Sequence, residues 1–541
     1  MKKQYYFLAV LLMVANAFAQ LTVPKEIFTH RDSLQGGLRM ERTCFNVQRY
    51  DLNVKVDIDK KYIEGYNDIT FKVVENTSKI QIDLFENLKI DSIVSNGKKL
   101  QFKRDLLATF IEFPSLLQKG NTEKIRFYYS GNPVVARKAP WDGGFVFSRD
   151  SNGKPWVAVA CQGFGASCWF PVKDSQSDEP DNGASIKVAV PDGLMNVSNG
   201  RFLGSENLNN GFTRWDWEVK NPINTYDMTV NIGDYVQFGE NYKGLDLNYY
   251  VLRSNLETAK KQFEEVKPMM DCFQSKFGEY PFKEDSYKLV ETPYLGMEHQ
   301  SAVAYGNHYT KGYLGNDLSG TGIGLFFDYI IIHESGHEWF GNSITSKDIA
   351  DMWIHEAFTM YSELVYLECQ YGYDKAMEYG HGLQRTIRND IPIIGHLGVN
   401  KEGSGDMYTK GASMLNTLRH IIGKDKWWSI LLKYSQTYKK QIIDTKTVID
   451  FFNKESGMDL TSIFNQYLRY TSIPKLEIRK NNKDFEFRWI TDEPNFSMPI
   501  DLEIKGKILR VVGNNDWSKI DAKVKSIDDI KFDRASFYVK Y

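Results

Sequence analysis

Three titratable side chains fall close together in one apolar segment of the sequence. His333, Glu334 and His337 form an H-E-x-x-H pattern within LFFDYIIIHESGHEWFGN, which begins at Leu325. Residues four apart lie on one face of a helix, so the two histidines can direct ring nitrogens at a single ion. Glu334 is placed to act on a water molecule bound to that ion. The spacing therefore predicts a metal site that activates water.

The surroundings of this motif favour a buried helix. Residues 325–332 are apolar on almost every side, which is typical of a helix packed all round. Titratable groups are costly in such a setting unless something pairs with them, and a metal ion would do so. We expect Gly341-Asn342 to end the helix with an αL residue. The alternative interpretation is a pair of hydrogen-bonded core histidines that bind no metal.

A third ligand follows on a second helical pattern that ends near Gly372. Glu356 lies on this pattern, and a helix, a turn and a returning helix would bring it beside the two histidines. Two His and one Glu leave the fourth tetrahedral position of zinc open to water, which is typical of a catalytic site with one Zn²⁺ per chain. Glu363 shares the face of Glu356. It is a candidate acceptor for a ligating His N–H, which would fix the histidine tautomer. The packing face of this pattern consists of Ala357, Met360, Tyr361, Leu364, Val365 and Leu367.

Length and composition indicate a globular protein of several domains. The 541 residues are too many for one core, and 42% hydrophobic and 25% charged residues are ordinary values. Lys and Arg number 67 against 69 Asp and Glu, which gives a net charge of −2. This balance argues against a nucleic-acid-binding protein and against a polybasic membrane-surface protein.

The first residues resemble a cleavable signal peptide. Lys2-Lys3 precede an apolar stretch from Tyr5 to Val14, and Ala17-Phe18-Ala19 forms an A-x-A cleavage site before Gln20. The apolar run is too short for a membrane anchor, and no other stretch is long and apolar enough to span a bilayer. We therefore expect residues 1–19 to be removed and the mature chain to be exported, to a periplasm or outside the cell, without a membrane span.

The five cysteines are too few and too scattered for a disulfide framework. In an oxidising compartment one bridge can form, and Cys161 and Cys168 are the closest pair in the sequence. Free buried thiols are an equal alternative. The remaining cysteines are Cys44, Cys272 and Cys369.

Hydrophobic patterning divides the mature chain into three parts. Short alternating runs broken by turn signals predict an N-terminal all-β sandwich domain over residues 20–240. Residues 241–474 predict a mixed α/β domain that carries the metal site. Residues 475–541 predict a small C-terminal β domain, with ASFYVKY as its last strand. The predicted fold class is thus multidomain α+β.

Within the middle part, individual elements can be predicted. Leu256–Phe277 has a helical pattern, residues 286–304 contain short strands, and helices dominate from Gly324 to about Tyr470. Thr445 is a plausible N-cap for the helical run TKTVIDFFNKES.

The zinc motif resembles that of a known family. HESGHEWFGNSIT, followed by Glu356 with 18 residues between it and His337, is similar to the gluzincin aminopeptidases, which include aminopeptidase N and the leukotriene-hydrolysing aminopeptidases. This resemblance implies a thermolysin-like catalytic domain. Gly296-Met297-Glu298 matches the family's G-x-M-E-N motif, in which the glutamate binds the substrate's α-ammonium group. Gly296 and Met297 are therefore expected to line the substrate site.

Two further segments resemble the same family. Tyr408-Thr409-Lys410-Gly411 matches its Y-x-K-G motif, so Tyr408 would hydrogen-bond the oxyanion. Cys161-Gln162-Gly163 resembles the segment whose Gln or Glu joins the amine-binding site, which assigns Gln162 to substrate binding.

The chain also departs from the family pattern. Leu295 replaces the first glycine and His299 the asparagine of the amine motif, and His355 and Ala357 replace the residues that usually flank Glu356. We expect His299 to be a polar residue lining the pocket; the alternative is a fourth neighbour of the metal site. The chain stops before the large C-terminal helical domain of longer relatives, so a more open site is expected.

Together these features predict an exported zinc-dependent aminopeptidase. It would hydrolyse the N-terminal peptide bond of peptides with a free N-terminus, with Glu334 as general base and Tyr408 as oxyanion donor. One alternative is a zinc endopeptidase or another zinc hydrolase on the same scaffold. Another is a non-catalytic surface-binding protein that retains a relic site.

Overall fold

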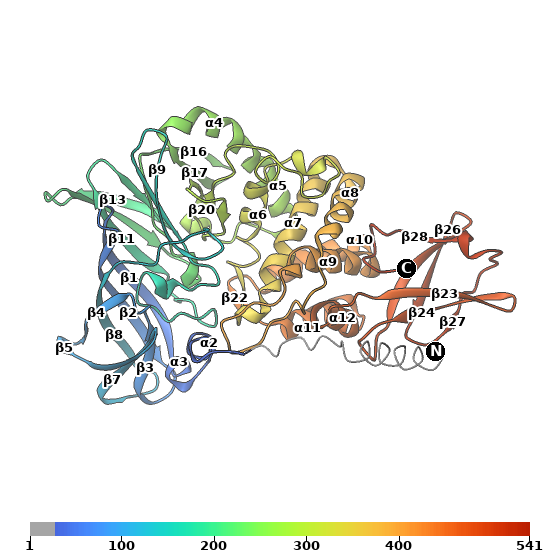
Figure 1. Cartoon of the computed structure of the whole chain (residues 1–541), viewed down its shortest axis with the longest axis horizontal. Helices are drawn as coiled ribbons and strands as arrows, with labels where there is room; N and C mark the ends of the chain where they lie inside the picture. Colours follow the sequence, from blue (N-terminus) through green and yellow to red (C-terminus); the bar gives the residue numbers. More distant parts are fainter. Residues whose placement is uncertain (1–26) are drawn as a thin grey trace, which may run out of the picture.

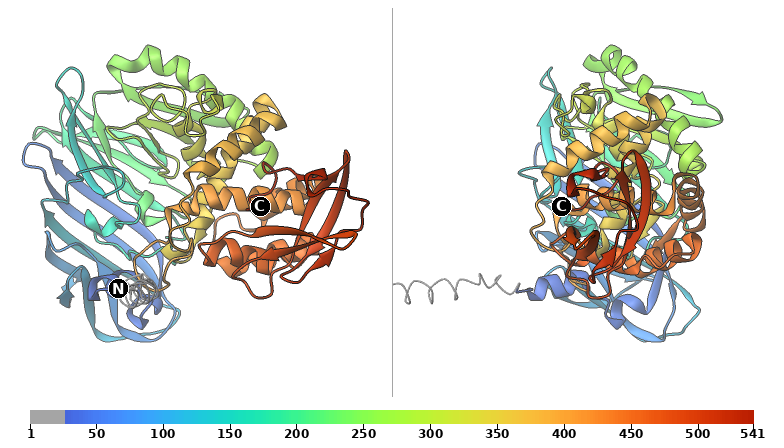
Figure 2. Two further views of the ribbon diagram at one scale, coloured as in Figure 1. Left: turned by 45° about the vertical axis from the view of Figure 1, so that its right-hand side comes forward. Right: turned by 90° about the vertical axis from the view of Figure 1, so that its right-hand side faces the viewer.

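The computed structural model describes residues 27–541 and has three regions. A β-rich N-terminal region, a helical middle region and a β-rich C-terminal region follow one another along the long axis (Figure 1). Figure 2 shows the helices between the two β-rich regions. The predicted fold class, multidomain α+β, is confirmed. The signal peptide expected at residues 1–19 lies outside the described residues.

The N-terminal region is built from three antiparallel or mixed sheets. The largest has eight strands in the order β13-β14-β11-β1-β2-β8-β4-β5, a second has the order β12-β15-β10-β9, and a third β3-β7-β6. Its elements are α2 His30–Gly36, α3 Met40–Thr43, β1 Phe45–Asp57, β2 Tyr62–Val73, β3 Thr77–Asp83, β4 Leu88–Ser95, β5 Lys98–Lys99, β6 Gln101–Asp105, β7 Ala108–Leu117, β8 Thr122–Gly131, β9 Gly144–Arg149, β10 Pro155–Ala160, β11 Ala184–Pro191, β12 Met195–Val197, β13 Arg201–Asn207, β14 Phe212–Val219 and β15 Asn231–Gly233.

Alternation of side chains explains how these strands form a core. In β1, Tyr50, Leu52, Val54 and Val56 are buried, whereas the residues between them are partly exposed. A strand directs successive side chains to opposite faces, so one face enters the core and the other meets solvent. Buried residues from all three sheets belong to one hydrophobic cluster.

The middle region combines a five-stranded sheet with nine α-helices of the described chain. The sheet has the order β16-β17-β18-β20-β19. The elements are β16 Tyr235–Tyr242, β17 Leu245–Leu252, α4 Leu256–Gln262, α5 Val266–Phe277, β18 Tyr287–Glu291, β19 Gly296–Met297, β20 Val303–Tyr305, α6 Tyr329–Gly336, β21 Ile344–Ser346, α7 Trp353–Tyr371, α8 Tyr373–Leu383, α9 Thr409–Ile422, α10 Lys424–Thr437, β22 Gln441–Ile443, α11 Thr445–Ser456 and α12 Thr461–Arg469.

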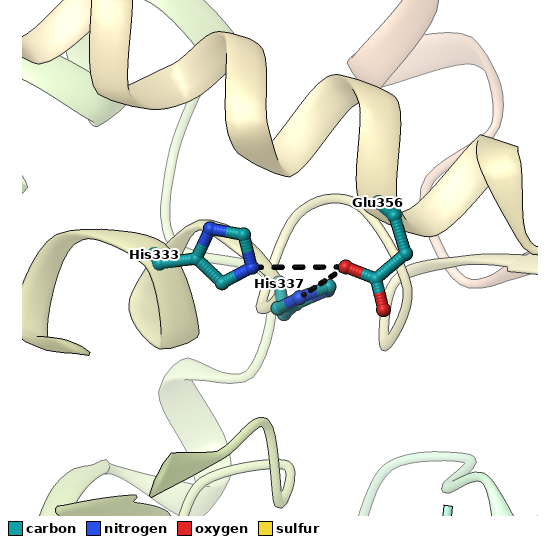
Figure 3. Close-up of side chains that lie close together, drawn as sticks. All are labelled: His333, His337 and Glu356. Carbon is teal, nitrogen blue, oxygen red and sulfur yellow. Dashed lines mark ion pairs between the residues drawn. The ribbon is translucent and has the colours of Figure 1, made fainter. Parts of the chain in front are cut away.

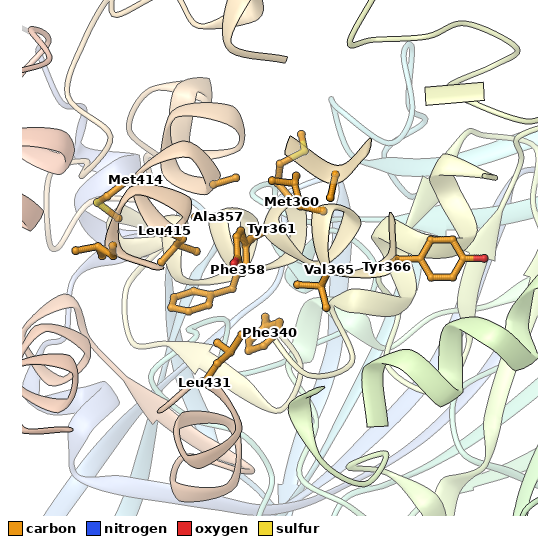
Figure 4. Close-up of a cluster of buried hydrophobic side chains, with 14 of the residues drawn as sticks. Phe340, Ala357, Phe358, Met360, Tyr361, Val365, Tyr366, Met414, Leu415 and Leu431 are labelled. Atoms are coloured by element: carbon orange, nitrogen blue, oxygen red, sulfur yellow. The ribbon is translucent and has the colours of Figure 1, made fainter. Parts of the chain in front are cut away.

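Helix α7 is the centre of this region. Its residues from Trp353 to Leu367 are buried, and it packs against α5, α6, α8 and α9. Figure 4 shows Phe358, Tyr361 and Val365 of α7 among apolar side chains of the neighbouring helices. The helix ends at Tyr371, and the next residue, Gly372, has a φ of 89° that is unfavourable for residues other than glycine. A helix enclosed in this way is a rigid platform for the polar side chains that it carries.

Helix α6 is shorter than the sequence predicted. It begins at Tyr329 because the Asp328 side chain accepts hydrogen bonds from the N–H groups of Ile330 and Ile331, which makes Asp328 the N-cap. The predicted start at Leu325 was therefore wrong. The predicted αL end at Gly341-Asn342 was also wrong, because α6 ends at Gly336 and Gly341 has a φ of 133°.

The C-terminal region contains two three-stranded sheets, β23-β24-β27 and β26-β25-β28. The strands are β23 Lys475–Asn481, β24 Asp484–Ile490, β25 Met498–Ile504, β26 Lys507–Gly513, β27 Ser518–Lys519 and β28 Ile530–Phe532. The strand predicted over residues 535–541 was wrong: this segment is irregular, with one bridge between Lys475 and Lys540. Its backbone forms hydrogen bonds outside a sheet: the Tyr538 carbonyl accepts one from the Tyr467 hydroxyl.

One other local prediction, the N-cap of the helical run that follows Thr445, is corrected by the structure. Asp444, not Thr445, caps α11, because its side chain accepts the N–H of Thr447. The Thr445 hydroxyl instead donates to Asp351 over 2.6 Å.

The disulfide joins Cys272 of α5 to Cys369 of α7, 97 residues apart in the sequence. Cys161 and Cys168, the closest pair in the sequence, remain free and buried, as does Cys44.

Within residues 27–541, no helix has the length and apolarity needed to cross a bilayer.

Candidate active site

Three potential metal ligands meet between α6 and α7. His333 lies on α6, His337 directly follows it, and Glu356 lies in the first turn of α7 (Figure 3). Glu356 Oε2 is 3.7 Å from His333 Nε2 and 3.3 Å from His337 Nε2. All three side chains are buried. The structure thus brings together the three residues that the spacing predicted as ligands.

The other ring nitrogen of each histidine is engaged, which fixes the tautomers. His333 Nδ1 lies 2.7 Å from Glu363 Oε1, and the Tyr379 hydroxyl donates to the second oxygen of Glu363. His337 Nδ1 lies 3.0 Å from the Phe340 carbonyl. Carboxylate and carbonyl oxygens only accept, so both Nδ1 atoms carry the proton. Both Nε2 lone pairs are then available to a metal.

The residues present fit a zinc ion. Two imidazole nitrogens and one carboxylate oxygen are ligands of catalytic Zn²⁺, and ligand atoms about 2.0–2.1 Å from a tetrahedral ion lie roughly 3.3 Å apart. The observed 3.3 and 3.7 Å are close to that separation. Moreover, Glu356 Oε2 is buried without a hydrogen-bond partner among the described residues. A buried carboxylate oxygen without a partner is costly, and a metal ion would satisfy it.

Glu334 faces the same cavity next to the ligands. Burial raises the pKa of Glu334 to about 7, although His333 and His337 oppose the rise. A carboxyl group with a pKa near neutrality can both accept and return a proton. Gly296 on β19 makes room for it: a Cβ on Gly296 would lie 2.8 Å from Glu334 Oε1.

A second polar cluster surrounds Glu298. Gln162, from the N-terminal region, donates one hydrogen bond to Glu298 Oε1 and another of 3.4 Å to Glu356 Oε1. The Tyr226 hydroxyl donates to Glu298 Oε1 over 3.2 Å. Burial raises the pKa of Glu298. Side chains from two regions therefore hold this carboxylate beside the metal ligands.

His355 has a role that the sequence did not indicate. The N–H of Ser346 donates to His355 Nε2 over 2.8 Å, so the neutral ring carries its proton on Nδ1. Burial lowers the pKa of His355 to about 3, which keeps the ring neutral. His355 Nδ1 lies 3.4 Å from the Tyr226 hydroxyl oxygen, so the ring turns that hydroxyl proton toward Glu298. Tyr226 itself has no sequence motif that could have marked it.

Tyr408 lies at the N-cap position of α9 and lines the cavity. Its ring stacks on that of His333, with 6.0 Å between centroids. Burial raises its pKa well above the usual value, and the Glu356 carboxylate adds to the rise, so the phenol stays a hydrogen-bond donor. A Cβ on Gly411 would lie 2.5 Å from the Ala357 Cβ. The close approach of α9 and α7 that keeps Tyr408 beside Glu356 therefore requires a glycine at position 411.

The cavity around these groups has a volume of about 550 Å³. Leu295 and Met297 line it together with His333, Glu334, His337, Glu356 and Tyr408. The prediction that His299 lines the pocket was wrong. His299 is fully buried behind the cavity wall, burial lowers its pKa to about 3, and neither ring nitrogen has a partner within the described chain. The sequence did not indicate the cavity residues Trp141, Asp142, Phe164, Tyr313, Glu402 and Met407.

Comparisons with known proteins agree with this geometry. The family described as "Peptidase family M1 domain" matches residues 261–467, and "Peptidase M1 N-terminal domain" matches residues 46–226. The chain therefore belongs to peptidase family M1, which confirms the resemblance to the gluzincin aminopeptidases.

Individual relatives are distant. "Leucyl aminopeptidase" of Saccharolobus solfataricus and "Probable aminopeptidase 1" of Sulfurisphaera tokodaii are each 21% identical to the chain and match 91% of it. The chain spans 63% of the length of each. A solved structure of an M1 zinc metallopeptidase from Deinococcus radiodurans, a mutant bound to a Tyr-Ser-Ala substrate, has a TM-score of 0.66 at 19% identity. It matches over 80% of this chain and 96% of that protein.

Proposed function

We propose that the protein is a zinc-dependent aminopeptidase that removes residues from the free N-terminus of peptides. The observation that carries this proposal is the position of Glu298: a buried carboxylate, held by Gln162 and Tyr226, in the same cavity as the three metal ligands. A fixed negative charge in such a site pairs naturally with an ammonium group. The names of the aminopeptidase relatives and the tripeptide bound to the Deinococcus protein support the same substrate class.

His333, His337 and Glu356 would hold one Zn²⁺. When bound, zinc lowers the pKa of water to about 7 and polarises a carbonyl group. Glu363 keeps the His333 ring oriented for this role through the 2.7 Å contact at Nδ1.

Glu334 would act as the general base. Its carboxylate takes the proton of the attacking water and passes it to the nitrogen of the departing amine. The Tyr408 hydroxyl donates a hydrogen bond to the oxygen that becomes negative as the carbonyl carbon turns tetrahedral. Because this phenol remains protonated at neutral pH, it can serve as a donor throughout the cycle.

Glu298 would select the chain end. An α-ammonium group paired with this carboxylate brings the first peptide bond next to the metal ligands, since Gln162 contacts both Glu298 and Glu356. Acetylation of the N-terminus removes the positive charge and leaves Glu298 buried without a cation. The cost of an unpaired buried charge makes such a peptide a poor substrate.

Two peptides that differ only in N-terminal acetylation test the proposal. We expect the zinc-loaded protein to release the first residue of the free peptide and to cleave the acetylated peptide at least about 100-fold more slowly. A difference of this size corresponds to the loss of a charged hydrogen bond together with the desolvation of the carboxylate that is left unpaired. Glu298→Gln should reduce this discrimination. Equal cleavage of both peptides, or cleavage at internal bonds, would instead indicate an endopeptidase.

We also propose that the chain is exported. The signal-like pattern of residues 1–19 supports this proposal, and so does the Cys272–Cys369 disulfide, since disulfides persist in oxidising compartments. Expression of the full chain in a bacterium, cell fractionation and N-terminal sequencing test it. A periplasmic or secreted product that begins at Gln20 is expected, and an uncleaved cytosolic product would refute it.

A further inference from the structure

One cavity carboxylate is left without a role in the proposed reaction. Glu298, Glu334 and Glu356 are assigned to the ammonium group, the proton transfer and the metal. Asp142 Oδ2 accepts the N–H groups of Arg137 and Lys138, so it is engaged within its own loop. The remaining cavity carboxylate is Glu402, which has no hydrogen bond or ion pair to any described residue.

Glu402 lies in a loop whose backbone is fixed on both sides. The side-chain amide of Asn400 donates a hydrogen bond to the Gly163 carbonyl over 2.9 Å, which attaches the loop to the N-terminal region. Gly403 approaches the Ile393 carbonyl so closely that a Cβ there would be 1.9 Å from the oxygen. The loop therefore presents Glu402 to the cavity at a defined position.

The carboxylate of Glu402 lies at the amine-binding end of the cavity. Its Oε1 atom is 3.1 Å from the place that a Cβ on Gly163 would occupy, directly after Gln162. No lysine or arginine of residues 27–541 is among the side chains that line the cavity. A partly buried carboxylate without a cationic partner in the protein is unfavourable unless a bound molecule supplies one.

We propose that Glu402 makes the cavity selective for peptides whose N-terminal residue is lysine or arginine. This inference rests on the aminopeptidase function proposed above. Such a residue carries two positive charges, and the cavity offers two carboxylates for them: Glu298 for the α-ammonium group and Glu402 for the side chain. The apolar walls at Phe164 and Met407 suit the methylene stem of a long cationic side chain.

Substrates that differ in charge but hardly in shape test this selectivity. We would measure kcat/KM of the zinc-loaded protein for fluorogenic amides of arginine and of citrulline, its neutral isostere, with leucine as a reference substrate. The kcat/KM for the arginine amide should exceed that for the citrulline amide by about 10- to 100-fold, which corresponds to the free energy of a buried charged hydrogen bond. Glu402→Gln should abolish most of this ratio, and Asp142→Asn, a matched change in the same cavity, should leave it within about threefold.

Several outcomes would overturn the inference. Equal kcat/KM for arginine and citrulline in the wild type would do so, and so would a ratio unchanged in Glu402→Gln. A parallel loss of arginine, citrulline and leucine turnover in Glu402→Gln would make Glu402 part of the ammonium site instead. Cleavage of the leucine amide without charge selectivity refutes this inference alone, whereas absence of cleavage of every amide refutes the proposed function as well.

Discussion

Glu363 Oε1 lies 2.7 Å from Nδ1 of His333, and the Tyr379 hydroxyl holds the other oxygen of the same carboxylate. This pair links α7 to α6 on the side of the His333 ring that faces away from the proposed metal position. A carboxylate at this position makes the histidine a stronger and better-oriented ligand.

Glu363→Gln should therefore weaken zinc binding by about 10- to 100-fold. The amide offers its N–H₂ or its oxygen to His333 and can no longer enforce the Nδ1–H tautomer as strongly. Competition with a chelator of known affinity measures the effect without reference to turnover. Glu368→Gln, on the same helix but paired with Arg419, serves as the control and should bind zinc as the wild type does. Equal affinities in the two variants would contradict the role of Glu363.

Glu334→Gln should retain zinc and lose turnover. The substitution preserves shape but removes the proton acceptor, so kcat should fall by about 10²- to 10⁴-fold. Metal analysis of the purified variant, together with kcat on a leucine amide, separates the two effects. Near-normal kcat would exclude Glu334 as general base, and loss of zinc would indicate a structural role.

The stability of the protein should increase with pH through the titration of Lys288. Its side chain on β18 is buried and donates to the Gly200 carbonyl, and burial lowers its pKa from 10.5 to about 7. Below pH 7 the lysine is charged in both the folded and the unfolded states, so the full desolvation penalty applies. Between pH 7 and 10.5 the folded state is neutral while the unfolded state still binds the proton. The penalty therefore decreases as the pH rises through this window.

Lys288→Met removes that titration. Relative to this variant, the wild type should gain roughly 3 kcal/mol of unfolding free energy between pH 6.5 and 9.5, from 1.36 kcal/mol per pH unit above the folded pKa. Urea denaturation at the two pH values measures the difference. The Lys288→Met variant lacks the hydrogen bond to Gly200 at both pH values, so this loss cancels when the two stability differences are compared. A difference that does not change with pH would show that Lys288 does not titrate in this range.

Removal of the Cys272–Cys369 disulfide should destabilise the protein by about 2–5 kcal/mol. The bond closes a loop across 97 residues and restricts the unfolded chain accordingly. Chemical denaturation of the Cys272→Ala/Cys369→Ala variant measures the loss. A reducing agent should destabilise the wild type and leave the variant unchanged; an equal response of both would mean that the bond is not formed in solution.

The meeting of His333, His337 and Glu356 was predictable because these residues lie close together in the sequence. The spacing of His333 and His337 follows from helix geometry, and Glu356 lies on the next long helical pattern. Glu298 and Tyr408 were found only through motif resemblance, since nothing in their neighbours marks them. The start of α6 was missed although Asp328 is a residue type common at N-caps and caps the helix through its own neighbours, Ile330 and Ile331. Its further contacts with Tyr305 and Asn307 could not be predicted from the local sequence.

The residues that the sequence did not indicate share one property. Tyr226 contacts Glu298 and Glu402 lines the cavity, but neither lies in a segment with a chemical motif. Only the packing of the N-terminal region against the middle region brings Tyr226 to Glu298. The disulfide has the same origin: Cys272 and Cys369 face each other because α5 packs on α7. His299 illustrates the opposite case, in which a motif position that looked suited to the pocket is buried behind it.

The side chains in and around the cavity come from two regions of the chain, and this division has an evolutionary consequence. The β-rich N-terminal region supplies Gln162 and Tyr226, whereas the three proposed metal ligands lie on α6, directly after α6, and on α7. If the proposed function holds, substitutions in the N-terminal region can alter which peptide ends bind while the proposed zinc ligands and general base stay unchanged. Substrate preference and catalytic mechanism can thus evolve at different rates in descendants of such a protein.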